Sequence, residues 1–181
     1  MRQVREMEGQ YRLPALELVE EVFTQYDSPE EGQMVRRLVE EIRAGRYDIP
    51  RLELVMVGEE DGVIGYAMFS RFPIEGKYEE ELLLLSPVAV KTALQRQHIS
   101  KDLLEYGFGR AEELGFRAVL VEGDPKNYAA QGFRPSCLFG IEAGPNVRLP
   151  RPECLMAKEL AEGALEGMGG FVDFSFYETL R

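Results

Sequence analysis

The sequence contains few of the residues that build metal sites or disulfide frameworks. It has one histidine, His98, and two cysteines, Cys137 and Cys154, among 181 residues. The cysteine spacing matches no metal motif, and a single histidine does not favour zinc, so no metal site is expected. Two isolated cysteines are typical of reduced thiols, and we therefore expect a cytoplasmic location.

Long apolar runs and an excess of basic residues are also absent. No run approaches the length needed to cross a bilayer, and the first residues do not resemble a secretory signal. The formal net charge of -11 argues against nucleic acid as a partner, because phosphate backbones require a basic surface. This acidity would attract a cationic substrate, although it also serves simply to keep a protein soluble.

The length of the chain suits one domain with a sizeable core. We expect that domain over residues 1–160, followed at 161–181 by a glycine-rich stretch and an aromatic strand. Val172, Phe174 and Phe176 alternate with polar residues there. Such a strand needs a cover, either on the same domain or in a partner subunit, and it suggests a homodimer.

Strand and helix patterns alternate along the chain and predict an α/β fold. Ser28 followed by Pro29 has the form of a helix start, because serine caps the first turn and proline fits the first helical position. Asp61-Gly62 is typical of a turn between two strands. Near-continuous apolar residues predict buried strands at 82–90 and at 118–121, the latter within an apolar run from 116 to 122.

The stretch between 82 and 133 is the most informative. Its first strand runs into a polar turn, Gln95 to Ser100, which opens an amphipathic helix; a second strand and a Tyr128 segment ending in Gly132-Phe133 follow. A helix N-terminus after such a turn points backbone N–H groups at one spot, where the helix dipole favours an anion. The turn is therefore a candidate for holding a pyrophosphate.

These residues resemble the GNAT superfamily of N-acetyltransferases, and the stretch Asp-Pro-x-x-Tyr-x-x-x-Gly-Phe is most similar to its bacterial branch of small predicted acetyltransferases. The family signature is Gln/Arg-x-x-Gly-x-Gly/Ala, and here His98 and Ser100 stand at the two glycine positions, so the loop is degenerate. The resemblance implies a mixed, mostly antiparallel, splayed sheet with helices on both faces. Coenzyme A is expected to enter between the two strands.

The resemblance implies acetyl-CoA as co-substrate and assigns it a set of contacts. These are the strand residues Val88, Ala89 and Val90, the turn and helix start at Gln95, Arg96, Gln97, His98, Ile99, Ser100 and Lys101, and Asn127. A plain buried strand and an ordinary polar loop would use the same residues. Ser100 either binds a phosphate or caps the helix.

Two catalytic residues follow from the resemblance. Tyr128 matches the general acid that protonates the departing thiolate, since the pKa of a phenol, about 10, lies just above that of a thiol, about 8.5. The alternative is a tyrosine that only packs ahead of Gly132. Glu81, beside Glu80, is the candidate general base, although three consecutive glutamates also fit a solvated strand end. His98 is not expected to act in catalysis.

The predicted function is transfer of an acetyl group from acetyl-CoA to a primary amine by direct attack. The acceptor is either a small-molecule amine or a protein amino group. One alternative is a GNAT-fold protein that binds acyl-CoA without catalysis. The other is an interaction module that has lost the cofactor and works through its surface.

Overall fold

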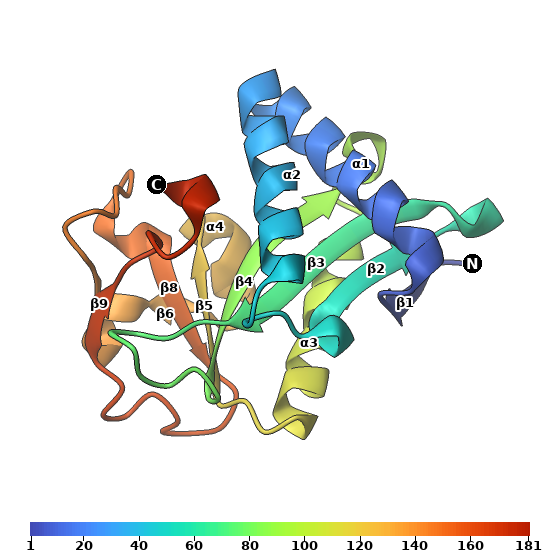
Figure 1. The fold of residues 1–181 in the computed structure, drawn as a ribbon. Helices are drawn as coiled ribbons and strands as arrows, with labels where there is room; N and C mark the ends of the chain where they lie inside the picture. Colours follow the sequence, from blue (N-terminus) through green and yellow to red (C-terminus); the bar gives the residue numbers. More distant parts are fainter. The chain divides into compact units, whose positions relative to one another are not determined.

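The computed structural model describes residues 1–181, apart from the side chain of Asp61. It divides into two compact units: unit 1 comprises Met1–Ser70 and Ser86–Arg110, and unit 2 comprises Arg71–Leu85 and Ala111–Arg181. The elements in chain order are β1 (Gln3–Glu6), α1 (Gly9–Tyr26), α2 (Pro29–Ala44), β2 (Glu53–Val57), β3 (Val63–Arg71), β4 (Leu82–Val90), α3 (Ile99–Glu113), β5 (Ala118–Glu122), α4 (Pro125–Tyr128), β6 (Arg134–Pro135), β7 (Ile141–Ala143), β8 (Leu155–Glu159) and β9 (Gly170–Val172) (Figure 1).

The sheet of unit 1 is built on antiparallel pairs, β1 with β2 and β2 with β3. Its strands carry side chains alternately to two faces. On one face, Gly65 approaches α3 so closely that a Cβ there would lie 2.6 Å from the Ile99 side chain. On the other face, Tyr66 donates a hydrogen bond to Glu53 (2.7 Å), which in turn binds Arg43 of α2. Helices therefore cover both faces of this sheet.

Helices α1 and α2 lie side by side in unit 1 (Figure 1). The predicted start of α2 is confirmed: the Ser28 hydroxyl accepts a hydrogen bond from the Glu31 N–H (3.1 Å), and Pro29 is the first helical residue. Gly32 permits the close contact, because a Cβ there would lie 2.5 Å from the Glu20 carbonyl oxygen of α1. Glycine is therefore required at this crossing.

The sheet of unit 2 mixes parallel and antiparallel pairs. The first half of β4 runs parallel to β5, with Leu82 opposite Ala118 and Leu84 opposite Leu120. These pairs end at Leu120, whereas β5 continues to Glu122 and pairs with β8 along its whole length. Strand β8 is antiparallel to both β5 and β6. The predicted α/β class with a mixed, mostly antiparallel sheet is confirmed.

The predicted C-terminal aromatic strand is wrong beyond Val172. Strand β9 pairs in parallel with β7 and ends at Val172. Phe174 and Phe176 then fold onto Phe72, with ring centroids 5.3 and 5.5 Å away, because burial of their rings outweighs continued pairing. The rings are thus covered within unit 2, which removes the reason for expecting a partner subunit there. The homodimer and the domain boundary at residue 160 stay predictions.

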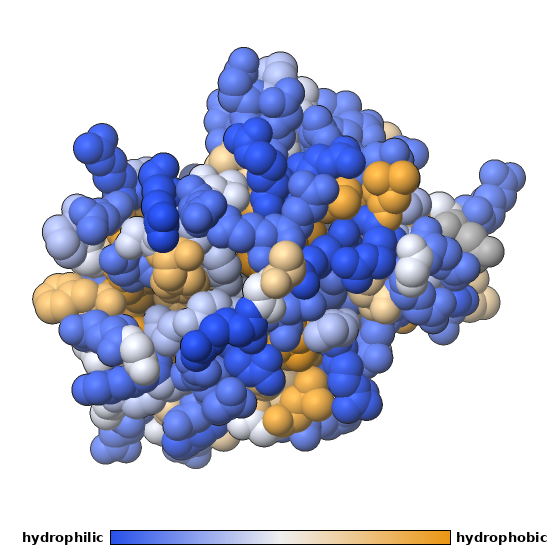
Figure 2. All heavy atoms as spheres, viewed as in Figure 1, coloured by the Kyte–Doolittle hydropathy of each residue, from blue (hydrophilic) through white to orange (hydrophobic). Residues whose placement is uncertain are grey.

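The surface shown in Figure 2 is mostly hydrophilic, with small separate apolar areas. This agrees with a chain in which 29% of the residues are charged. Among the described residues, no helix combines the length and the hydropathy that crossing a bilayer would require.

Candidate functional site

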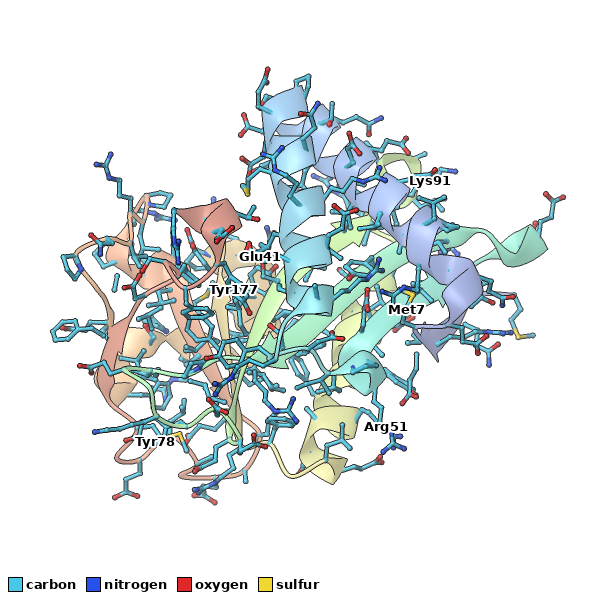
Figure 3. All side chains as sticks on the ribbon, in the orientation of Figure 1. Met7, Glu41, Arg51, Tyr78, Lys91 and Tyr177 are labelled. Atoms are coloured by element: carbon cyan, nitrogen blue, oxygen red, sulfur yellow. The ribbon has the colours of Figure 1, made fainter. Side chains whose placement is uncertain are left out.

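The candidate anion-binding loop lies in unit 1 and begins where the chain leaves β4. Lys91, labelled in Figure 3, donates its backbone N–H to the Ile64 carbonyl (2.9 Å), and a single 3-10 turn follows at Thr92–Leu94. Helix α3 begins at Ile99, and the Asp102 N–H donates to the His98 carbonyl (3.0 Å). Ser100 therefore lies inside the first turn and does not cap the helix.

Two residues of this loop have left-handed backbone conformations. The φ angle is 62° at Arg96 and 65° at His98. Residues with side chains seldom adopt this region, although histidine is among the enriched exceptions. His98 stands where the family signature has its first glycine, so the loop has the backbone form that glycine would provide. Ser100 needs no such form, because it is helical.

Unbonded amides are concentrated in the same loop. Within the described chain, the backbone N–H groups of residues 96 to 101 donate no hydrogen bond to another residue. Successive N–H groups in alternating left- and right-handed conformations form a concave anion site, and the positive end of the α3 dipole adds to it. The exposed side chains of Arg96 and Lys101 supply positive charge nearby. The arrangement suits a phosphate or pyrophosphate.

The backbone form of the loop gives a stability prediction. A left-handed residue with a Cβ costs about 1–2 kcal/mol, whereas a new glycine costs about 0.5–1 kcal/mol of unfolded-state entropy. His98→Gly should therefore raise the free energy of unfolding by about 0.5–1 kcal/mol. Gln95→Gly is the control: at φ -64° there is no strain to relieve, so it should lower stability by a similar amount. Urea unfolding that shows equal losses for both variants would contradict the prediction.

The predicted pantetheine contacts lie directly before this loop. Ala89 is buried, and Val88 and Val90 are half-buried, at the end of β4. This position fits the expected backbone contacts, which stay a prediction. Asn127 is exposed and belongs to unit 2, and its assignment to the cofactor also stays a prediction.

Tyr128 closes the short helix α4 in unit 2. The Asp124 carboxylate caps that helix by accepting from the Lys126 N–H (2.9 Å). The Tyr128 ring meets Phe133 edge to face, with centroids 5.6 Å apart and an interplanar angle of 81°. Its hydroxyl makes no hydrogen bond within the described chain, and burial raises the pKa of the phenol. The phenol is thus a protonated donor without an internal acceptor.

Glu81 lies at the opposite end of β5 from Tyr128. Its carboxylate pairs with Arg117 (3.7 Å), and its carbonyl accepts from the Arg117 N–H (2.8 Å), at the level where β5 begins. From Arg117 to Glu122, five residues further on, the strand rises about 16 Å. Glu80 pairs with Arg71 (3.5 Å). The structure does not bring Glu81 together with Tyr128.

Gly123, to which the sequence analysis gave no role, is in close contact with Tyr128. A Cβ at Gly123 would lie 2.5 Å from Cε2 of the Tyr128 ring, so only glycine allows the ring to take this place. The available signal was a glycine directly after an apolar strand and five residues before the tyrosine. Across the described residues, no cluster of histidine, cysteine and carboxylate side chains could hold a metal ion.

Comparison with known proteins gives a consistent result. Residues 16–134 match the sequence profile of the acetyltransferase (GNAT) family. The uncharacterized N-acetyltransferase YhbS of Escherichia coli K12 is 30% identical over 124 residues, covering 68% of this chain and 71% of that protein. The crystal structure of YhbS from Escherichia coli in complex with CoA has a TM-score of 0.80 at 26% identity, covering 98% of this chain and 91% of that one. A GNAT family acetyltransferase from Brucella melitensis, in complex with acetyl-CoA, shares the fold with a TM-score of 0.74 at 21% identity, covering 100% and 99% of the two chains.

Proposed function

The chain belongs to the acetyltransferase (GNAT) family and is an N-acetyltransferase; from this premise we propose that it transfers the acetyl group of acetyl-CoA to a primary amine by direct attack. The observation that carries the proposal is the row of unbonded N–H groups at residues 96–101. YhbS, which is similar over most of its length, has been solved with CoA, and this supports the same co-substrate here.

The residues of the loop fit the phosphates of acetyl-CoA. The N–H groups of residues 96–101 would bind the pyrophosphate, and Arg96 and Lys101 would add charge. When bound, acetyl-CoA supplies an acetyl thioester, whose C–S bond breaks as the amine nitrogen forms a bond to the carbonyl carbon. Tyr128 would donate its phenol proton to the departing thiolate, and burial keeps that proton in place at neutral pH.

The acceptor is proposed to be a small-molecule amine or a protein amino group. A net charge of -11 attracts cations over long distances, and primary amines are cationic at neutral pH. We also propose that the protein is bacterial and works in the cytoplasm. Its two free cysteines and the bacterial sources of the similar proteins support this part of the proposal.

The alternative of a protein with a decayed cofactor loop is not favoured. It rested on the absence of glycine at positions 98 and 100. The φ angle of 65° at His98 provides the backbone form without glycine, and a helical Ser100 keeps its N–H available. The replacement of both glycines is therefore compatible with phosphate binding.

Two measurements test the proposed function. Calorimetric titration should detect binding of acetyl-CoA, and a thiol assay should detect release of coenzyme A when an amine panel is added. Binding without thiol release over the whole panel would favour the non-catalytic alternative. Absence of binding, with binding restored in His98→Gly/Ser100→Gly, would show that the loop has decayed and would overturn the proposal.

The contribution of the loop cations can be measured separately. Arg96→Ala and Lys101→Ala should each weaken acetyl-CoA binding by up to about fivefold, as expected for solvent-exposed charge pairs. The loss should shrink as salt is added. Lys77→Ala, which removes an equivalent exposed charge elsewhere, is the matched control and should leave affinity unchanged. Equal effects of all three variants would assign the losses to net charge alone.

A further inference from the structure

The end of β5 carries a carboxylate on one face and the candidate acid on the other. Glu122 is the last residue of the strand, and the Gly123 N–H continues the ladder by donating to the Cys154 carbonyl (2.9 Å). Because successive strand residues point to opposite faces, the Glu122 side chain and the Gly123 Cβ direction diverge. The Tyr128 ring lies along that Gly123 direction. Glu122 and Tyr128 therefore flank the same strand end from its two faces.

Strand β5 extends beyond its pairs with the first half of β4. The pairs with β4 run to Leu84 and Leu120, whereas β8 pairs with β5 as far as Glu122. Strand residues beyond the paired region keep backbone N–H and C=O groups that an extended ligand can bind. A ligand bound along this part of β5 would lie between the face that carries Glu122 and the face that carries Tyr128.

Glu122 has the properties of a proton acceptor. Within the described chain its carboxylate makes no hydrogen bond and no ion pair. The residue is exposed by its accessible surface, although neighbouring atoms partly desolvate the carboxyl group and raise its pKa. Glu81, by contrast, is paired with Arg117. A carboxylate that is unpaired and has a raised pKa is better suited to take a proton from an ammonium group near neutral pH.

We propose that Glu122 is the general base for the acceptor amine and that Gly123 is a positioning residue that lets Tyr128 reach its place as the acid. The inference rests on the proposed acetyl transfer and assigns its proton transfers. Glu122 takes one proton from the ammonium and passes it to solvent, and the nitrogen loses a second proton to solvent as the amide forms. Tyr128 gives one proton to the thiolate and regains one from solvent, so one proton is released per turnover.

The test is steady-state thiol release as a function of pH, with an amine that the enzyme accepts. Glu122→Gln should lower kcat/KM about a hundredfold at neutral pH, the lower end of the range for a positioned base. The wild-type rate should fall as the pH drops through the pKa of Glu122, which lies above the ordinary carboxyl value of 4.5. This fall, the acidic limb of the pH profile, should be absent in Glu122→Gln. Glu162→Gln is the matched control, because Glu162 is an exposed carboxylate of the same unit. This variant should keep the wild-type kcat/KM and the acidic limb of the pH profile.

Gly123 is tested through Tyr128. Gly123→Ala should lower kcat toward the level of Tyr128→Phe while the Kd for acetyl-CoA stays within about twofold, and the double variant should lose no more than Tyr128→Phe alone. Additive losses in the double variant would overturn the positioning role. Loss of the acidic limb in Glu81→Gln instead of Glu122→Gln would overturn the base assignment.

The inference and the proposed function fail in different ways. If the wild-type protein releases no thiol with any amine, both are overturned. If the wild-type protein is active and Glu122→Gln keeps its rate and its acidic limb, only the base assignment is overturned, and acetyl transfer stands.

Discussion

Tyr128→Phe is expected to lower kcat by about 10²–10⁴-fold, the range for removal of a positioned acid. The reason is that the variant lacks only the hydroxyl, the proposed donor to the departing thiolate. A phenylalanine ring keeps the contacts with Gly123 and Phe133. Thiol release measures kcat, and calorimetry should find the Kd for acetyl-CoA within about twofold of the wild-type value.

Tyr26→Phe is the control for this result. Tyr26 is 87% exposed in unit 1, so loss of its hydroxyl should leave kcat unchanged.

Burial raises the pKa of Tyr128, so the wild-type enzyme should lose no activity through ionisation of this phenol below about pH 10. If Tyr128→Phe retains full kcat, the thiolate leaves without help from this residue and the tyrosine has only a packing role.

The strands and helix around the candidate loop could be predicted because their signals are local. Near-continuous apolar residues at 82–90 and 118–121 predicted β4 and β5 within a residue, and the serine–proline pair at 28–29 predicted the start of α2. Each of these signals depends on a few neighbouring side chains. They do not depend on distant parts of the chain.

Whether the loop at residues 95–101 can bind phosphate could not be predicted from its residue types. His98 and Ser100 break the signature, and sequence reasoning could not separate a working loop from a decayed one. The difference lies in the φ angles at Arg96 and His98 and in which N–H groups remain unbonded. A signature written in glycine describes backbone freedom, and histidine can adopt the same form at a modest energetic cost.

Long-range register decided the remaining differences. Glu81 precedes the apolar strand and looked well placed for a base, yet the pairing of Leu82 with Ala118 puts it at the start of β5. Glu122 is the last residue of β5 and lies at the Tyr128 end of that strand, away from Glu81. Phe174 and Phe176 likewise found their cover in Phe72, about a hundred residues earlier. Contacts of this kind leave no local pattern.

Arg43→Met is expected to lower the free energy of unfolding by about 3–5 kcal/mol, because it leaves a buried carboxylate without its cation. Glu53 is 1% exposed and accepts hydrogen bonds from Arg43 Nε and from the Tyr66 hydroxyl, both at 2.7 Å. Arg43 also donates to the Arg12 carbonyl (3.3 Å) and so ties α2 to α1. Urea unfolding measures the loss, and methionine retains most of the apolar stem.

Arg36→Met is the matched control, since Arg36 lies on the same helix and pairs with Glu20 at 2.7 Å with both side chains about one-third exposed. Water can replace that partner, so the loss should be at most about 1 kcal/mol. Arg43→Met/Glu53→Gln should regain most of the stability lost in Arg43→Met, because the neutral amide oxygen still accepts from Tyr66 while the buried charge is gone. If instead the double variant is as unstable as Arg43→Met, it is the packing of the arginine side chain, and not its charge, that stabilises the contact between α2 and the sheet of unit 1.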